Sequence, residues 1–556
     1  MSRRSTWLAV AVSLVALVAG AARGDVSLAS VFGENMVLQR GMKVPVWGEA
    51  DAGEQVTVSL CGQEARARAD GDGAWRVTLA AMEAGGPFTM SVTGKNAIEL
   101  KNVLVGEVWV CSGQSNMAMT VNRCANAKQE IAAATFPRIR FFTVKRVTSA
   151  KPLDSVSGQW VECSPKTAGG FSGVGYFFGR KLHRALGVPM GLINTSWGGT
   201  PAEAWTSLPR LQATPELKPI LDRWGERLEA YPEVLRKYEE GPLRKWKDRK
   251  AKAQQAVAAA RKALQAAHAP DEKQAAQKTL DKARQQLRRL RRPPRRPRGP
   301  HSPHRPANLY NAMIRPLIPL AIRGAIWYQG ESNAHRAYQY RTLFPTMIRD
   351  WRARWGQGDF PFYWVQLANF LKVDEQPRSD PWPELREAQT MTLSLPHSGQ
   401  AVIIDIGEAR DIHPRNKQHV GLRLALNALA QDYGKDVVGA SPMFDSMTVE
   451  DGKVRVKFRN LGGGLVAKSF TDPVTESGPT LAKRFGRDDF LSLRPKAQVH
   501  GFAVAGADRQ FVWADEATLD GDCVVVASAK VARPVAVRYA WSNNPVCNLY
   551  SKAGLP

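Results

Sequence analysis

Short runs of alternating apolar and polar residues occupy both ends of the chain. Residues 25–100 hold three such runs, "KVPVWGEA", "EQVTVSL" and "AWRVTLA", separated by Asp/Gly turn signals. Residues 437–556 return to the same pattern in "KVRVKF" and "CVVVASA". Period-two alternation between turn signals is typical of antiparallel strands. We therefore expect an N-terminal β domain over 25–100 and a β-sandwich-like domain over 436–556.

The middle of the chain alternates buried strands with amphipathic helices. The apolar run ending at Cys111 is followed by the helical pattern "GVGYFFGRKLHRALG" and the buried run "VPMGLINTSWGGT". Three further apolar runs follow, "AIRGAIWYQG", "PFYWVQLANF" and "QAVIIDIG", and then the helical pattern "NKQHVGLRLALNALAQDYG". This order predicts an α/β domain with a parallel sheet over 101–435.

A basic segment, residues 211–306, interrupts that alternation. It is rich in Ala, Lys, Gln and Arg, which predicts two long helices broken near Ala269-Pro270 as an antiparallel hairpin, and then a Pro/Arg linker. The chain carries a net charge of +26, and residues 244–305 hold 20 Lys/Arg against 4 Asp/Glu. This insertion is either a solvated hairpin or a surface for an anionic polymer.

The first 24 residues resemble an export signal. Arg3 and Arg4 precede the short apolar run from Trp7 to Val18, and Ala19-Gly20-Ala21 fits a cleavage site. A short membrane anchor is the alternative, but no other run is long enough to span a bilayer. We expect a secreted or periplasmic protein with no transmembrane segment after signal removal, and no nucleic-acid partner.

Six cysteines are present, and an even number in an exported chain permits disulfides. Cys523 could pair with Cys547, and Cys111 or Cys124 with Cys163; the sequence does not decide. There is no CxxC motif and no Cys/His cluster at zinc spacing, so we expect neither a metal nor a cofactor.

Small polar residues follow four of the predicted strands. The first strand runs into Gly113-Gln114-Ser115-Asn116, the second into Trp197-Gly198-Gly199-Thr200, the third into Gln329-Gly330-Glu331-Ser332-Asn333, and the fifth leads to Asp411-Ile412-His413. Ligands bind beyond the carboxyl ends of the strands in open parallel sheets. The four segments therefore predict one site along one edge of the sheet.

The residue types in these segments suit nucleophilic catalysis. A serine hydroxyl needs a base that takes its proton, and a histidine oriented by a carboxylate is the usual one. We assign Ser115 as nucleophile, His413 as base and Asp411 as its orienting group. Asp405 or a backbone carbonyl is the alternative orienting group, because Asp411 lies only two residues from His413.

An oxyanion formed at the serine needs fixed hydrogen-bond donors. The N–H groups of Ser115 and of Gly198 or Gly199 could supply them, with the side-chain amide of Gln329 or Asn333. We expect Gln114, Asn116 and Glu331 to contact the substrate. The nucleophile motif G-x-S-x-G is not satisfied, because Met117 occupies its last position. This departure favours a flavodoxin-like hydrolase sheet over the α/β-hydrolase plan.

Several longer motifs resemble one family. "GQSNM", "INTSWGGTPAEAW", "LYNAMIRPLIPLAIRGAIWYQGESNA" and "DIHPRNKQHVGLRLA" are similar to the sialate O-acetylesterases, within the SGNH-type serine hydrolases. The resemblance implies a three-layer α/β/α catalytic domain with accessory β domains, and metal-independent hydrolysis of O-acetyl esters on sugars. It matches Ser115 to the family's nucleophile and His413 to its base. The basic hairpin lies outside it.

The substrate stays open at this stage. Acetylated sialic acid is the substrate that the family's name implies, and acetylated xylan or another polysaccharide is the rival. The alternative from another class is a non-catalytic protein that binds an acidic glycan through its β domains and hairpin. The intact serine–histidine pair argues against this alternative.

Overall fold

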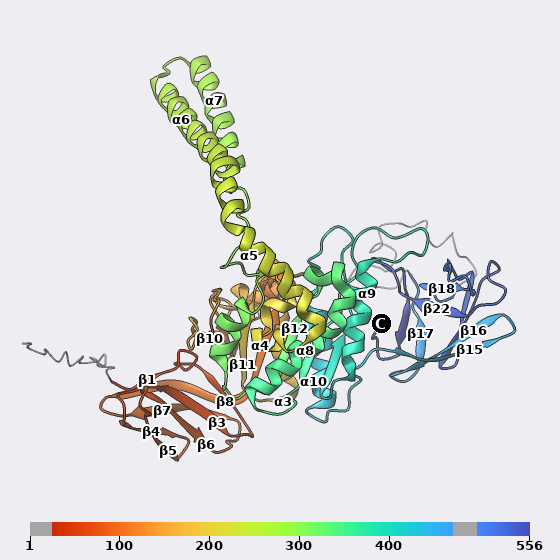
Figure 1. The fold of residues 1–556 in the computed structure, drawn as a ribbon, viewed down its shortest axis with the longest axis horizontal. Coiled ribbons are helices and arrows are strands. Elements are labelled where there is room, and N and C mark those ends of the chain that lie inside the picture. The colour runs from red at the N-terminus through yellow and green to blue at the C-terminus, as the bar shows by residue number, and fades with distance from the viewer. Residues whose placement is uncertain (1–24, 471–497) are drawn as a thin grey trace, which may run out of the picture.

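The computed structural model describes residues 25–470 and 498–556. The expected export signal, residues 1–24, lies outside them. The N-terminal β domain is built mostly of antiparallel strands (Figure 1). Its strands are β1 (Ser27–Leu28), β2 (Val37–Gln39), β3 (Val44–Glu49), β4 (Gln55–Leu60), β5 (Gln63–Arg68), β6 (Ala74–Leu79), β7 (Gly85–Thr93) and the first part of β8 (Ala97–Gly113).

Strand β8 continues without a break from the N-terminal β domain into the central sheet, across the boundary expected at residue 100. Glu107 lies buried where the two parts meet, and it accepts hydrogen bonds from Gln39, Arg40 and Arg323. Burial alone would raise the pKa of Glu107, but these partners, Arg323 foremost, hold it below its usual value. The shared strand and this cluster join the two parts firmly.

The central sheet has the order β10-β9-β11-β8-β12-β13-β14, with β10 antiparallel and the others parallel. Its further strands are β9 (Phe136–Thr143), β10 (Trp160–Cys163), β11 (Met190–Ser196), β12 (Gly324–Tyr328), β13 (Phe362–Val365) and β14 (Ser398–Ala401). The chain passes from β8 to β9 and β11 on one side, and then crosses to β12 on the other. β8 is thus the point at which the strand order reverses, where ligands bind in open α/β sheets.

Helices cover both faces of this sheet. Successive residues of β8 alternate between two cores: Val108 and Val110 pack with α8, and Trp109 and Cys111 pack with α3 and α10. The helices of the body are α1 (Ser115–Ala118), α2 (Ala127–Ala132), α3 (Gly173–Leu186), α4 (Leu208–Gln212), α8 (Ala337–Trp355), α9 (Pro381–Met391) and α10 (Lys417–Gln431). The protein therefore has a mixed α/β architecture with a central, mostly parallel sheet, as the sequence pattern predicts.

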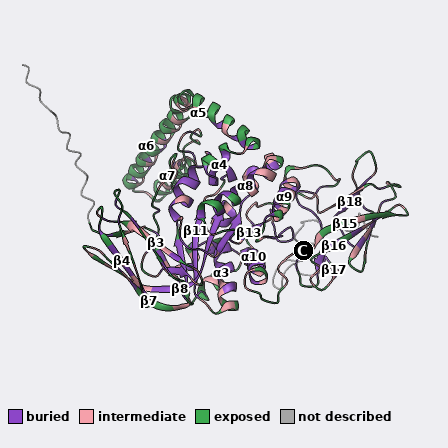
Figure 2. Cartoon of the chain, turned by 60° about the horizontal axis from the view of Figure 1, so that its bottom comes forward, coloured by how far each residue is buried: buried purple, intermediate pink, exposed green. Residues whose placement is uncertain are grey.

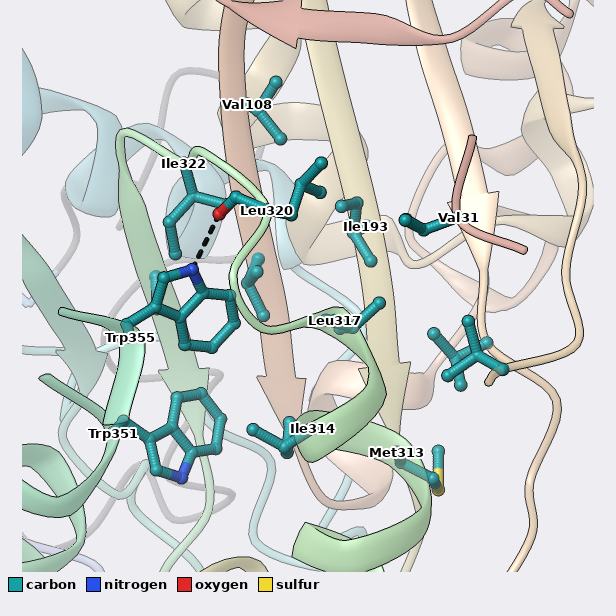
Figure 3. Close-up of a cluster of buried hydrophobic side chains, with 14 of the residues drawn as sticks. Val31, Val108, Ile193, Met313, Ile314, Leu317, Leu320, Ile322, Trp351 and Trp355 are labelled. Atoms are coloured by element: carbon teal, nitrogen blue, oxygen red, sulfur yellow. Dashed lines mark hydrogen bonds between the residues drawn. The ribbon is translucent and has the colours of Figure 1, made fainter. Parts of the chain in front are cut away.

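Burial is greatest in the central strands (Figure 2). Figure 3 shows part of the core where residues 313–322 pack on β8 and β11, with Ile193 near Leu317 and Val108 at the end that holds Leu320 and Ile322. Trp355 donates its indole N–H to the carbonyl oxygen of Leu320 at 2.7 Å, so the polar atom of this large side chain is satisfied (Figure 3). This packing holds β12 beside β8.

The insertion forms a helical hairpin that projects from the body (Figure 1). Its long first arm is α5 (Lys218–Tyr238), a π-helical turn (Glu239–Leu243) and α6 (Arg244–Ala266), and α7 (Pro270–Arg289) returns beside α6. The expected start at residue 211 is too early, since Leu211, Leu217 and Ile220 lie in the main core. The Pro/Arg stretch after α7 forms no helix.

In the described residues of the C-terminal part, antiparallel strands form three small sheets, ordered β15-β16-β21-β20, β17-β23 and β19-β18-β22. Its strands are β15 (Met443–Glu450), β16 (Lys453–Arg459), β17 (Leu465–Ala467), β18 (Phe502–Ala505), β19 (Val512–Trp513), β20 (Glu516–Asp520), β21 (Cys523–Ala527), β22 (Ala536–Tyr539) and β23 (Leu549–Ser551). The sheets share a core that includes Val456, Phe502 and Val524.

None of the disulfides considered from the sequence is formed. All six cysteines are among the described residues, and no disulfide joins any two of them. Cys111, Cys124 and Cys163 are buried, and burial raises the pKa of each thiol, to about 12 for Cys124 and Cys163. These three thiols therefore act as small apolar packing groups.

Across residues 25–470 and 498–556, no helix combines the length and the apolar character that crossing a bilayer requires.

Candidate active site

The turn after β8 presents Ser115 at the end of the switch strand. Gly113 has a φ of +134°, and a Cβ there would lie 2.2 Å from the carbonyl oxygen of Tyr328. Any side chain would therefore separate β8 from β12. Gln114 N donates to the same Tyr328 oxygen at 2.9 Å, which fixes the turn, and Ser115 begins the short helix α1.

His413 lies in hydrogen-bond contact with Ser115. The distance from His413 Nε2 to Ser115 Oγ is 2.8 Å, although the residues are 298 positions apart. Both side chains are partly exposed, so a substrate can reach them. This is the geometry that a general base needs beside a nucleophile.

Asp411 reaches the ring of His413 despite the short spacing. Its Oδ1 accepts the backbone N–H of His413 at 2.9 Å and lies 3.3 Å from His413 Nδ1. The alternative orienting group, Asp405, is buried in a bidentate pair with Arg423, with N–O distances of 2.5 and 2.6 Å. Of the two aspartates, only Asp411 is therefore placed to orient the ring.

The loop after β11 lies against the nucleophile. Trp197 N donates to the carbonyl oxygen of Gly113 at 3.0 Å, and a Cβ on Gly198 would lie 3.2 Å from Ser115 Cβ. Within the described residues, the N–H groups of Ser115, Gly198 and Gly199 have no hydrogen-bond acceptor. Backbone donors left unengaged beside a nucleophile suit the stabilisation of an oxyanion.

The two candidate side-chain amides differ in their availability. Gln329 Nε2 donates to Thr200 O at 3.2 Å and to Asn333 Oδ1 at 2.6 Å, so both of its hydrogens are used within the fold. Asn333 Nδ2 donates to Glu203 at 2.9 Å, which leaves its second hydrogen available. Gln329 is therefore a poor oxyanion donor in this conformation, and Asn333 is the one of the two with a hydrogen to offer.

We expected Gln114 and Asn116 to contact substrate, but both are buried and hold the site together. Gln114 Oε1 accepts the backbone N–H of Ser332 at 3.3 Å. Asn116 Nδ2 donates to Glu331 Oε1 at 2.6 Å and to Ile412 O at 3.0 Å. These bonds tie the nucleophile turn to the loops after β12 and before α10, so Gln114 and Asn116 are positioning residues.

Lys417, at the start of α10, is a buried residue beside the nucleophile turn whose place sequence reasoning missed. It is fully buried, and its Nζ donates to Asn116 Oδ1 at 2.7 Å. Burial lowers the pKa of Lys417 to about 8 and raises that of the neighbouring Glu331. A lysine at a helix start resembles any surface lysine in a sequence. Only the fold reveals that it lies beside Asn116 and Glu331, within the "GQSNM" and "GESN" segments.

The tryptophans and arginines near the candidate site differ in their exposure. Trp205 and Trp327 are fully buried in the core, whereas Trp197 beside Gly198 is half-buried and packs against that core. Arg336 forms an ion pair with Glu203 at 2.7 Å, and Arg410 is exposed.

Comparisons with known proteins agree on one activity. A family model described as a carbohydrate esterase, sialic acid-specific acetylesterase, matches residues 301–429. The sialate O-acetylesterase of Mus musculus is 32% identical over 476 residues, 76% of each chain. That of Homo sapiens is 31% identical over 452 residues, 73% of this chain and 71% of the relative.

A solved structure is similar over almost the whole chain. The crystal structure of a carbohydrate acetylesterase from Xanthomonas citri has a TM-score of 0.72 and 34% sequence identity, covering 96% of this chain and 98% of that one. Together with the relatives, it shows that the protein is a carbohydrate esterase. Within that class, the chain belongs to the sialate O-acetylesterase family.

Proposed function

We propose that the protein is a serine esterase that removes acetyl groups from sugar hydroxyls, with Ser115 as nucleophile, His413 as base and Asp411 as orienting group. The observation that carries the proposal is the 2.8 Å contact between Ser115 Oγ and His413 Nε2 at the strand-order reversal. The membership of the chain in an acetylesterase family supplies the reaction type.

The proposed reaction has two halves. His413 Nε2 takes the hydroxyl proton as Ser115 Oγ bonds to the acetyl carbon, and the carbonyl oxygen becomes an oxyanion facing the N–H groups of Ser115, Gly198 and Gly199. Collapse breaks the bond to the sugar oxygen, which leaves with the proton from His413. Water, deprotonated by His413, then releases acetate from the acetyl-serine. Asp411 keeps Nδ1–H of His413 oriented throughout.

We further propose that the catalytic part, residues 101–435, is a three-layer flavodoxin-like domain of the SGNH type between the two β domains. Two observations support this: helices on both faces of the sheet, and the nucleophile at the end of the switch strand. Export through residues 1–24, to the outside of the cell or the periplasm, belongs to the same proposal and rests on the sequence pattern alone.

The acetylated sugar is either sialic acid or a polysaccharide such as xylan. The relatives named sialate O-acetylesterase favour the first, and a carbohydrate acetylesterase that covers nearly the whole chain leaves room for the second. The serine–histidine contact argues against a role limited to glycan binding.

Acetate release tests the proposal. We would assay the purified chain on 4-nitrophenyl acetate, O-acetylated sialic acid and acetylated xylan, with Ser115→Ala and Ser446→Ala as paired variants. Ser446 is an exposed serine of β15, far along the chain from the site. We expect Ser115→Ala to lose about 10³-fold or more in kcat and Ser446→Ala to match the parent. Equal turnover by Ser115→Ala and the parent would exclude the proposed nucleophile.

A further inference from the structure

Positive charge gathers at the base of the helical hairpin. Residues 244–252 of α6 hold six Lys/Arg and one Asp, and residues 288–296 hold six Arg and no acidic residue. Since α6 and α7 run side by side in opposite directions, the two stretches lie at the same end, nearest the body (Figure 1). Lys245, Arg249 and Arg292 line a surface hollow there, around Trp246.

The linker after α7 returns along α5 to the active-site loops. Tyr238 of α5 donates its hydroxyl hydrogen to Pro294 O at 2.7 Å. Further on, Gly299 packs against the ring of Tyr231, one to two turns earlier on α5. Ala307 N then donates to Glu203 O at 3.0 Å. These contacts place the arginines of the linker and those of α5 side by side.

The guanidinium groups along this line lie close together without acidic partners of their own. Burial lowers the pKa of Arg298, and Arg227 and Arg295 lower it further; burial, Arg336 and Arg227 do the same at Arg223. The carboxylate that acts on both is Glu203, which is already paired with Arg336. Among the described residues, no ion pair neutralises Arg223, Arg227 or Arg298.

The row of charge ends at the candidate active site. Glu203 accepts from Arg336 and also from Asn333 Nδ2 at 2.9 Å, and Asn333 is a candidate oxyanion donor. Glu203 follows Gly198 and Gly199 by only a few residues. A ligand lying along the row therefore reaches the loops that surround Ser115.

We propose that this row binds the carboxylates of an O-acetylated acidic polysaccharide and guides the chain to Ser115. We name it the basic track; its members are Arg249, Arg292, Arg295, Arg298, Arg227 and Arg223. The inference rests on the esterase function proposed above and specifies its substrate. A polyanion relieves the repulsion between clustered cations and releases their counterions, which makes such binding sensitive to salt.

The length of the track favours a polymer over a single sugar. Arg223 and Arg249 are separated by 26 residues of nearly continuous helix, which at a rise of about 1.5 Å per residue spans roughly 40 Å. One acidic monosaccharide contacts only one end of that span, whereas a polyuronate carries carboxylates along all of it.

The test compares two charge-matched triple variants of the full chain. The track variant is Arg292→Gln/Arg295→Gln/Arg298→Gln; the control, nearer the hairpin tip, is Arg261→Gln/Lys262→Gln/Lys278→Gln. All six side chains are exposed, and each variant removes three positive charges. The substrates are acetylated polygalacturonate, neutral acetylated xylan and 4-nitrophenyl acetate, each at low and at high salt.

We expect the track variant to raise KM for acetylated polygalacturonate roughly tenfold at low salt, to flatten its salt dependence, and to leave 4-nitrophenyl acetate turnover unchanged. The control variant should behave as the parent. An unchanged KM for acetylated polygalacturonate in the track variant, or an equal change of KM in both variants, would disprove the proposed role of the basic track. If the track variant shows no change in KM while Ser115→Ala still abolishes acetate release, this inference is wrong and the esterase proposal is unaffected.

Discussion

At the scale of single residues, the sequence is informative wherever a side chain has one chemical use. Ser115, His413 and Asp411 were predicted from strand-tip position and chemistry, and they lie within hydrogen-bond or ion-pair distance of one another. Side chains with many uses could not be assigned in this way. Gln329 donates both amide hydrogens to groups of the fold, and Lys417 is buried in contact with Asn116 of the nucleophile turn. Their roles depend on neighbours that are distant in sequence.

Replacing Asp411 tests whether it orients the histidine. Asp411→Asn keeps the shape of the side chain but removes the charge that faces His413 Nδ1 at 3.3 Å. We expect kcat on 4-nitrophenyl acetate to fall roughly a hundredfold, within the range that general acid–base catalysis contributes, with KM and the melting temperature nearly unchanged. Steady-state kinetics with a thermal melt for each variant would measure this.

Asp405→Asn is the matched comparison, because it breaks a buried pair with Arg423 and does not contact His413. Removing one partner of a buried ion pair costs about 3–5 kcal/mol of stability. We therefore expect a large drop in melting temperature, with kcat of the folded fraction retained. The reverse result, in which Asp405→Asn loses turnover and Asp411→Asn does not, would transfer the orienting role to Asp405.

At the scale of helices and strands, the hydrophobic pattern predicted most strands of the parallel sheet. It failed where polar residues or a proline interrupt a strand, and where an apolar run continues beyond one. Strand β9 was not predicted, because "FPRIRFFT" places a proline and two arginines within its eight residues. The last strand is only Ser398–Ala401, although the apolar run continues through the buried residues 402–406. An apolar run predicts that its residues are buried. How many of them form a strand depends on hydrogen bonds to a neighbouring strand.

Helix α10 carries a pH-dependent element. Its cap, Asn416, accepts the backbone N–H of His419 at 3.1 Å and lies 2.9 Å from His419 Nδ1. Burial, aided by Arg423, lowers the pKa of His419 to about 4. Between pH 6.5 and 4 the unfolded chain therefore binds more protons than the native one, so stability is complete above pH 6.5 and falls as the pH drops through that window.

Replacing the histidine should remove that dependence. The free energy of unfolding of the parent should decrease between pH 7 and pH 4.5. We expect this decrease to be smaller in His419→Gln, by up to about 3 kcal/mol. Urea denaturation at both pH values measures it, with His301→Gln, at an exposed histidine, as control. The same loss of stability in all three proteins would show that His419 does not contribute.

At the scale of the whole molecule, the described residues form a body from which the helical hairpin projects as an arm (Figure 1). β8 belongs to both the N-terminal β domain and the central sheet, which composition could not reveal because each half of the strand looks normal for its own domain. The arm, in contrast, could be predicted from its composition as a basic helical hairpin. The residue at which it leaves the body could not be predicted. Trp224 of α5 belongs to the main core.

Removing the arm tests this division. The residues buried between α6 and α7, among them Ala253, Ala260 and Leu280, join none of the body's core clusters. The contact from Tyr238 to Pro294 keeps the two ends of the arm together. We therefore expect a chain in which a six-residue Gly/Ser linker replaces residues 244–290 to fold, to melt within about 4 °C of the parent and to cleave 4-nitrophenyl acetate within about twofold of the parental rate. Calorimetry and steady-state kinetics measure both.

A melting temperature lowered by more than about 10 °C would mean that the arm stabilises the body, and the basic track would then have to be studied by charge substitutions alone.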